Sequence, residues 1–323
     1  MHMWNRLVAA LSFTLMAGVA AAETYPTRPI TFVVPYSAGG GTDIMARLIA
    51  EGLHKEWGQP VVVENRPGAG GNIGANRVAH SAADGYTVLV TAGALAIAPA
   101  LYKHLGYDPL KDFVPVTQIA TVPLLVVTSS DSPLNSIADL IALAKKDGAN
   151  VTYATFGVQS PSSMAGGSIR HLAGVAMTEV PFKGSSAALP DVLAGRMTVG
   201  IFDTVSVTPM VKGSRLKALA ITGPRRAPAL PNVPTLVESG IAFDTVGWHA
   251  VFVPAATPPA VVAKLNTAIN KTLALPKLRN TIAENGSIPI EPPTTVAQWT
   301  KQFRDDVPAW DKVVRSLQIK PID

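Results

Sequence analysis

Three consecutive glycines, Gly39 to Gly41, stand between an apolar run at residues 30–34 and a helical repeat of apolar residues at 44–57. Glycine adopts positive φ without steric cost, so a turn of this kind lets the backbone approach a ligand closely. Amides left unpaired at the start of a helix carry partial positive charge and bind small anions. Thr42 or Asp43 can cap this helix, and Asp43 can instead order the turn or contact the ligand. The predicted chemistry is anion binding.

A second glycine turn follows after one more strand candidate. Residues 61–64 read as a strand, and the glycine-rich residues 65–74 lead into another helix. Two neighbouring turns of this kind favour a shared site for a carboxylate. A dinucleotide fingerprint is disfavoured because the sixth position of the motif is Ile73, with the third glycine delayed to Gly74, and the chain has no Walker lysine motif.

Polar residues at the ends of later strands are further candidates. Asp203 either accepts a hydrogen bond from a ligand amine or hydroxyl, or caps the helix or turn that follows. Ser160 and Ser163 lie at a helix start, where they either cap the helix or contact the ligand. Lys183 either neutralises a distant carboxylate of the ligand or is solvated.

The sequence contains few patterns that are typical of catalytic sites. The chain has no cysteine, and its histidines are widely spaced, with no HExxH motif or other metal pattern. It also lacks the Gly-x-Ser-x-Gly turn of the α/β-hydrolases. His249, beside Trp248, is expected to pack between domains. We therefore expect no catalytic residue, no metal and no cofactor.

The elements that position these residues repeat as strand-helix units. Residues 86–91 form the third strand of the first part of the chain, and a new series of units begins at residues 151–154. Alternating strands and helices predict parallel sheets covered by helices, with ligands at the carboxyl ends of the strands. The C-terminal helices have no strands between them and are expected to cover the first domain. The chain would then cross between domains twice, which makes a hinge with a cleft.

The first residues are expected to be a targeting signal. A basic residue, an apolar run and a small-residue end before Glu23 predict a cleaved secretory signal at residues 1–22. Without cysteine there is no lipid anchor, so the expected location is the periplasm. The formal net charge is +5, and the basic residues form no long stripe with interleaved aromatics, so nucleic acid is not an expected partner.

Several motifs resemble one family over almost the whole chain. They include Val63-Glu64-Asn65-Arg66-Pro67-Gly68-Ala69-Gly70-Gly71-Asn72, Val180-Pro181-Phe182-Lys183-Gly184, Phe202-Asp203 and Val253-Pro254-Ala255-Ala256-Thr257-Pro258. From about Tyr25 onward the chain is similar to the Bug family, the periplasmic solute-binding receptors of tripartite tricarboxylate transporters. This chain departs from the usual family pattern at Gln159-Ser160-Pro161-Ser162-Ser163-Met164 and at Tyr36-Ser37, which leaves amino acids, aliphatic dicarboxylates and aromatic carboxylates open as ligands.

The resemblance implies an α/β, two-lobed periplasmic-binding-protein fold of the Venus flytrap type II, with two parallel-rich sheets and a cleft between the lobes. Lobe 1 would comprise residues 23–123 plus 247–323, and lobe 2 residues 124–246. The first two turns would grip a carboxylate as a pincer, and second-lobe loops would set specificity. The expected ligand contacts are Tyr36, Ser37, Ala38, Gly39, Gly40, Gly41, Thr42, Asp43, Gly68, Ala69, Gly70, Gly71, Asn72, Thr91, Thr155, Ser160, Ser163, Lys183 and Asp203.

The leading hypothesis is a monomeric receptor without catalysis. It would capture a small carboxylate and deliver it transiently to membrane transporter subunits or to a sensor kinase. The alternative is a secreted enzyme acting on a small carboxylate, with Asp43, Lys183 and Asp203 as its only visible candidates for chemistry. A binding protein for a peptide or a sugar is a third possibility.

Overall fold

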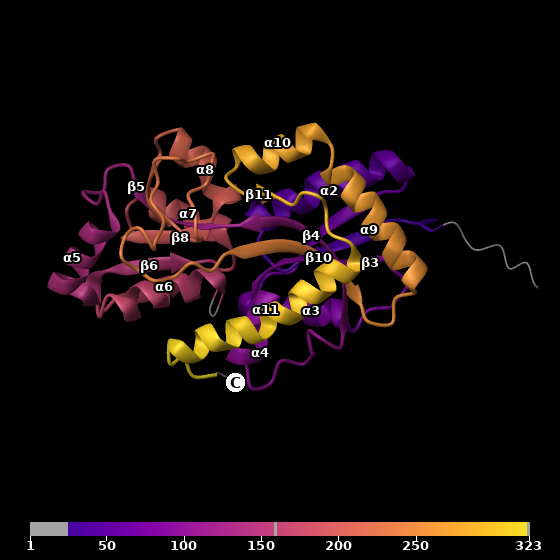
Figure 1. Cartoon of the computed structure of the whole chain (residues 1–323), viewed down its shortest axis with the longest axis horizontal. Coiled ribbons are helices and arrows are strands. Elements are labelled where there is room, and N and C mark those ends of the chain that lie inside the picture. Colours follow the sequence, from indigo (N-terminus) through magenta and orange to yellow (C-terminus); the bar gives the residue numbers. More distant parts are fainter. Residues whose placement is uncertain (1–24, 158–159, 322–323) are drawn as a thin grey trace, which may run out of the picture.

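Two mixed β-sheets, each with helices packed on it, make up the molecule (Figure 1). This computed structural model describes residues 25–157 and 160–321. The predicted secretory signal at residues 1–22 lies outside the described residues. Within them, no helix is long and apolar enough to cross a membrane.

The first sheet has the strand order β11-β4-β10-β3-β1-β2. Parallel pairing joins β1 to β2 and β3, whereas β10 pairs antiparallel with β3 and β4. The strands are β1 (Ile30–Val34), β2 (Val61–Asn65), β3 (Thr87–Ala92), β4 (Phe113–Val122), β10 (Gly247–Pro254) and β11 (Ile288–Pro289). Its helices are α2 (Gly41–Trp57), α3 (Asn72–Ala79), α4 (Ala94–Leu101), α9 (Pro259–Leu273), α10 (Pro276–Glu284) and α11 (Val296–Ser316), with a short 3-10 turn η1 (Ala69–Gly71) before α3.

The second sheet has the order β7-β6-β8-β5-β9. Here β6 pairs in parallel with β7 and β8, and β5 runs antiparallel to β8 and β9. The strands are β5 (Leu124–Ser129), β6 (Thr152–Thr155), β7 (Thr178–Pro181), β8 (Val199–Asp203) and β9 (Leu216–Ile221). The helices are α5 (Ile137–Asp147), α6 (Pro161–Leu172), α7 (Ser185–Leu193) and α8 (Thr204–Lys212), with a 3-10 turn η2 (Gly148–Asn150) after α5.

The chain passes between the sheets twice. Only Pro123 separates β4 from β5, and the return runs from β9 to β10. The antiparallel pairs of both sheets involve these crossing strands and their neighbours, whereas the strand-helix units pair in parallel. The parallel strands therefore end at the boundary between the lobes, where helices begin.

The C-terminal helices cover the first sheet, as the sequence predicts. Helix α11 packs on α4 and β4, and α9 packs on α2 and β4. Trp248 and Phe252 of β10 stack with Trp299 and Phe303 of α11 in edge-to-face and tilted pairs, with ring centroids 4.9–6.1 Å apart. These aromatic contacts fix β10, and with it one wall of the space between the lobes.

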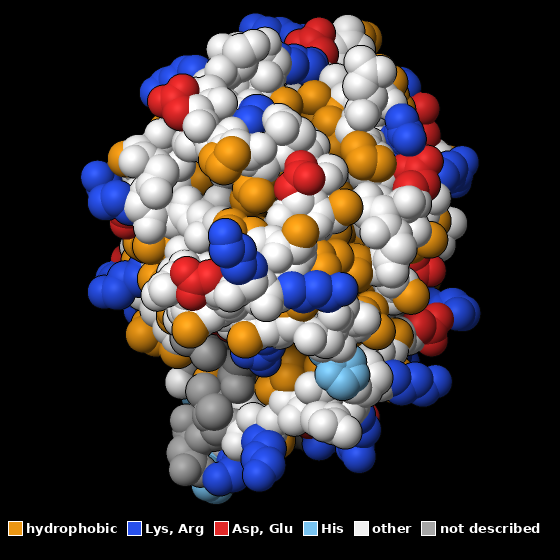
Figure 2. Space-filling model, turned by 90° about the vertical axis from the view of Figure 1, so that its left-hand side faces the viewer, with side chains coloured by type: hydrophobic (Ala, Val, Ile, Leu, Met, Phe, Trp, Pro, Cys, Tyr) orange, Lys and Arg blue, Asp and Glu red, His pale blue; other side chains and the backbone are white. Residues whose placement is uncertain are grey.

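The surface at the end of the second lobe is chemically mixed. Figure 2 shows basic side chains dispersed over this face, with acidic side chains among them and only small apolar areas between. No single patch on the face shown stands out as a docking surface. Polar residues line a cavity between the lobes instead.

Candidate functional site

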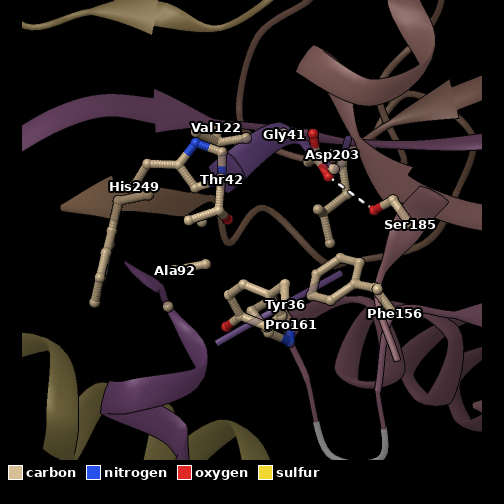
Figure 3. Close-up of a pocket in the computed structure, with 16 residues that line it drawn as sticks. Tyr36, Gly41, Thr42, Ala92, Val122, Phe156, Pro161, Ser185, Asp203 and His249 are labelled. Carbon is tan, nitrogen blue, oxygen red and sulfur yellow. Dashed lines mark hydrogen bonds between the residues drawn. The ribbon is translucent and has the colours of Figure 1, made fainter. Parts of the chain in front are cut away.

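A cavity lies between the two lobes, where helices begin on both sides (Figure 3). Its free volume is about 30 Å³, room for about two water molecules, so a small-molecule ligand requires the lobes to separate from this closed form. It is lined by the starts of α2, α6, α7 and α8, the end of β3 and the crossing strands. The lining residues are Tyr36, Gly40, Gly41, Thr42, Ala92, Gly93, Val122, Leu124, Phe156, Pro161, Gly184, Ser185, Asp203, Gly247, Trp248 and His249.

The lobes are closed on one another at the first glycine turn. The amide and hydroxyl of Ser37 both donate to the carbonyl oxygen of Lys183, at 3.1 and 2.9 Å. Ser186 donates its hydroxyl proton to the carbonyl oxygen of Ala38 (2.7 Å), and the amide of Gly41 donates to Ser206 Oγ (2.8 Å). Direct bonds across the cleft define a closed arrangement.

The buried carboxylate of Asp43 orders the first turn. Its oxygens accept hydrogen bonds from the Gly39 amide (2.8 Å), Arg47 Nε (2.9 Å) and Asn65 Nδ2 (3.0 Å), and Asn65 also donates to the Tyr36 carbonyl oxygen. Burial opposes ionisation of Asp43, but the bonds from Arg47, Gly39 and Asn65 outweigh it and hold its pKa below the ordinary value. Asp43 is absent from the cavity lining, and the structure places it behind the turn.

Asp203 caps helix α8 and lines the cavity. Its Oδ1 accepts from the Ser206 amide (2.9 Å), its Oδ2 accepts from Ser185 Oγ (2.9 Å), and the Ser206 hydroxyl lies 2.9 Å from both oxygens. The carboxylate also lies against Gly41 of the other lobe, where an added Cβ would be 2.0 Å from Oδ1. In the closed form the Asp203 carboxylate therefore faces the start of α2.

Tyr36 separates the first turn from the second. The residues from Gly68 to Asn72 line two other cavities, which Tyr36 also lines. One has a larger free volume, about 170 Å³, and includes Lys183, and the other includes Thr91. The Tyr36 hydroxyl has no hydrogen-bond partner among the described residues, and burial raises its pKa to about 12. The second turn also meets the other lobe, since a Cβ on Gly157 would be 3.2 Å from Gly70 Cα. In this closed form the two turns do not face one common cavity.

The second-lobe hydroxyls expected near the ligand gather around Glu179 instead. Thr155 Oγ1 donates to Glu179 Oε1 (2.8 Å) and Ser163 Oγ to Oε2 (2.9 Å). Ser160 caps α6 by accepting from the Ser163 amide (3.3 Å). Lys183 is exposed and contributes its carbonyl oxygen to the contact between lobes. None of these four residues lines the cavity at the first glycine turn, but Lys183 lines the cavity at the second.

Sequence reasoning assigned no ligand contact to the residues that form the remaining wall. His249 is almost fully buried, and its Nδ1 has no hydrogen-bond partner among the described residues. Burial lowers its pKa to about 4, although the nearby Asp203 carboxylate opposes this, so the ring is neutral near pH 7. Phe156, Pro161 and Trp248 add apolar surface. The dipeptide Trp248-His249 next to the second crossing was the signal that could have placed this wall in the site.

The described residues give little support for chemistry in the cavity. They contain no group of three or more His, Asp or Glu side chains able to hold a metal ion. Ser185 donates to Asp203, and no hydroxyl of the described chain is hydrogen-bonded to His249. The described residues therefore do not pair a nucleophile with a base in this closed form. They do provide unpaired amides and polar side chains that can bind a ligand.

Asp306 of α11 positions the cavity wall and gives a pH-dependent prediction. Trp248 Nε1 donates to its Oδ2 (2.9 Å), while burial raises the Asp306 pKa to about 6. The folded protein therefore binds a proton between about pH 4 and 6 that the unfolded chain has lost, so this group's contribution to stability falls as the pH rises through that window.

We expect Asp306→Asn to stabilise the protein by about 1–2 kcal/mol at pH 8, after allowing for partial solvent screening. The asparagine still accepts from Trp248 but carries no buried charge, so the gain should vanish near pH 4. Urea unfolding at both pH values measures it. Equal gains at pH 4 and pH 8 would contradict the assigned titration.

Comparisons with known proteins identify the family and the solved structures that this chain resembles. The family model described as tripartite tricarboxylate transporter family receptor matches residues 45–319. The chain is similar to the solved periplasmic binding protein BugD, with 33% identity, a TM-score of 0.89, and coverage of 92% of this chain and all of that one.

Two further solved structures resemble it, each at 33% identity. Rpa4515 of R. palustris with adipate has a TM-score of 0.87 over 92% of this chain, and MatC of Rhodopseudomonas palustris with bound malate has 0.85 over 90%. All of each matched chain is covered. Both the predicted resemblance and the predicted two-lobed periplasmic-binding-protein fold are confirmed.

Proposed function

The chain belongs to the tripartite tricarboxylate transporter receptor family, and we propose that it is a receptor that closes its lobes around a small carboxylate. The family consists of solute-binding receptors, and the two ligand-bound neighbours hold dicarboxylates, adipate and malate.

The observation that carries this proposal is the start of α2. Gly40, Gly41 and Thr42 line the cavity, and the amides of Thr42 and Asp43 have no hydrogen-bond acceptor among the described residues. Partial positive charge at a helix start favours a carboxylate there. The same turn carries the bonds that join the lobes, so a ligand bound at the amides would favour the closed form.

The remaining assignments follow from this role. Residues 1–22 would direct export to the periplasm and be removed, and the chain without cysteine would carry no lipid anchor there. We take residues 23–123 plus 247–323 as lobe 1 and 124–246 as lobe 2, because the two sheets divide at these positions. The protein would act as a single copy that binds without catalysis and passes its ligand to membrane transporter subunits, or reports it to a sensor kinase.

The test is a thermal-shift screen of carboxylic acids and their methyl esters, after native mass spectrometry shows that bound ligand has been removed. An acid present at one hundred times its Kd should add about 2.7 kcal/mol of stability. The corresponding rise in Tm is about 5 °C or more, because each kcal/mol shifts a chain of this size by a few degrees.

The ester is the matched control because it keeps the carbon skeleton of the acid, removes the anion and adds only one methyl group. We expect the shift to disappear with it. Equal shifts with acid and ester would favour a peptide or sugar binder instead, and no shift with amino acids, dicarboxylates, tricarboxylates or aromatic acids would contradict the proposal.

A further inference from the structure

The polar groups inside the cavity divide between two sides. Figure 3 shows His249 on one side and Asp203 with Ser185 on the other, with Thr42 and Gly41 between them. His249 belongs to β10 of the first sheet, and Asp203 ends β8 of the second. Tyr36, Phe156 and Pro161 supply apolar surface below. A ligand that enters here as the lobes separate contacts both polar sides at once.

His249 offers a neutral donor. Its Nδ1 is enclosed and has no hydrogen-bond partner among the described residues, whereas Nε2 is not enclosed in this way and the ring lines the cavity. A proton on the enclosed Nδ1 would leave a buried N–H without an acceptor, which is rarer in folded proteins than a buried acceptor without a donor. We therefore assign the ring proton to Nε2, which can donate it to a ligand oxygen.

Asp203 offers only acceptors. An ionised carboxylate has about four lone-pair positions and no proton to donate. Ser185 Oγ, the Ser206 amide and the Ser206 hydroxyl occupy about three of them, and each of these groups belongs to the protein. The position that remains repels a second carboxylate and attracts a hydroxyl or an ammonium group. Ser185 Oγ donates its hydrogen bond to Asp203, and its lone pairs can accept from the same ligand group.

We propose that this cavity selects 2-hydroxy or 2-amino carboxylates, with His249 Nε2 donating to the ligand carboxylate and Asp203 accepting from the neighbouring hydroxyl or ammonium. The inference rests on the proposed function and narrows its ligand class. The donor and the acceptor of the ligand must lie close together, because His249, Thr42 and Asp203 line one small cavity.

The experiment measures Kd by calorimetry for two matched series: propionate, lactate and alanine, and succinate, malate and aspartate. Within each series only the group on the second carbon changes. We expect at least one of lactate and alanine to bind about 10- to 100-fold more tightly than propionate, and at least one of malate and aspartate to exceed succinate by the same factor. This is the effect of one hydrogen bond to a charged group.

Variants separate the two roles. Asp203→Asn keeps a residue that caps α8 well, and should abolish the preference for the donor-bearing acids. His249→Phe keeps an aromatic ring, and should weaken every acid in the panel about 10-fold while preserving that preference. His249→Gln, which can present an N–H, should restore part of the loss. His104→Phe, at an exposed histidine of the same lobe, is the control and should change nothing.

The outcomes are distinct. Binding of the donor-free acids as tightly as their hydroxy and amino counterparts overturns this inference and leaves the carboxylate receptor intact. A preference that survives Asp203→Asn also overturns it. If no acid in either series or in the wider panel binds, the proposed function fails and this inference falls with it.

Discussion

Replacing Gly41 with alanine is expected to hold the two lobes apart and to weaken ligand binding by about 100-fold or more. In the closed form an added Cβ would lie 2.0 Å from Asp203 Oδ1, 2.7 Å from its Cγ and 3.1 Å from Val205 Cβ. The carboxylate cannot swing aside cheaply, because hydrogen bonds from Ser185 and Ser206 hold it. In an open form the same methyl group would meet solvent.

Gly40→Ala is the matched control for this prediction. A Cβ there would touch only the Ser37 carbonyl oxygen, at 3.4 Å, and the φ of Gly40 is −79°, which alanine adopts without strain. Small-angle scattering with and without a bound carboxylate measures closure, and calorimetry measures Kd. A Gly41→Ala protein that still compacts with ligand as the Gly40→Ala protein does would show that Asp203 does not meet Gly41 in the closed state.

Replacing Asp43 with alanine is expected to lower the free energy of unfolding by about 3 kcal/mol and to reduce carboxylate affinity at least 10-fold. The change removes the acceptor of three hydrogen bonds and leaves the Gly39 amide and Asn65 without their partner. The turn that presents the α2 amides then loses its fixed shape. The Asp43 side chain does not line the cavity, so the loss of affinity arises from disorder of the turn that presents the amides.

The pH dependence of the Asp43 effect has a definite sign. Its folded-state pKa is depressed, so its contribution to stability is present above the unfolded value of about 3.9 and is lost as the pH falls through the folded value. Denaturant unfolding of wild type and Asp43→Ala should therefore differ most near pH 7 and converge in strong acid. Glu51→Ala, which removes an exposed ion pair with Lys55 on the same helix, is the control and should have only a small effect on the free energy of unfolding. Convergence at neutral pH would contradict the assigned network.

The local elements were predictable because their signals are local. Apolar residues Met45, Ile49 and Leu53 recur along α2 and are buried against the sheet, as their spacing predicts. Ser136 caps α5 by accepting from the Asp139 amide, another short-range pattern. Two helices escaped prediction. Helix α4 is buried almost all round and so has no amphipathic period, and α8 contains Pro209, which ordinarily disfavours a helix interior.

The sequence by itself therefore determined the glycine turns, most strands and helices, the family and the carboxylate hypothesis. Only the tertiary structure decided which polar side chains face the cavity. Thr155 and Ser163 bond Glu179, which follows them in the chain by 24 and 16 residues, whereas His249 reaches the cavity because β10 lies between β3 and β4. Sheet order and lobe closure bring such groups together through long-range pairing, and a local pattern of residues contains no information about those distances.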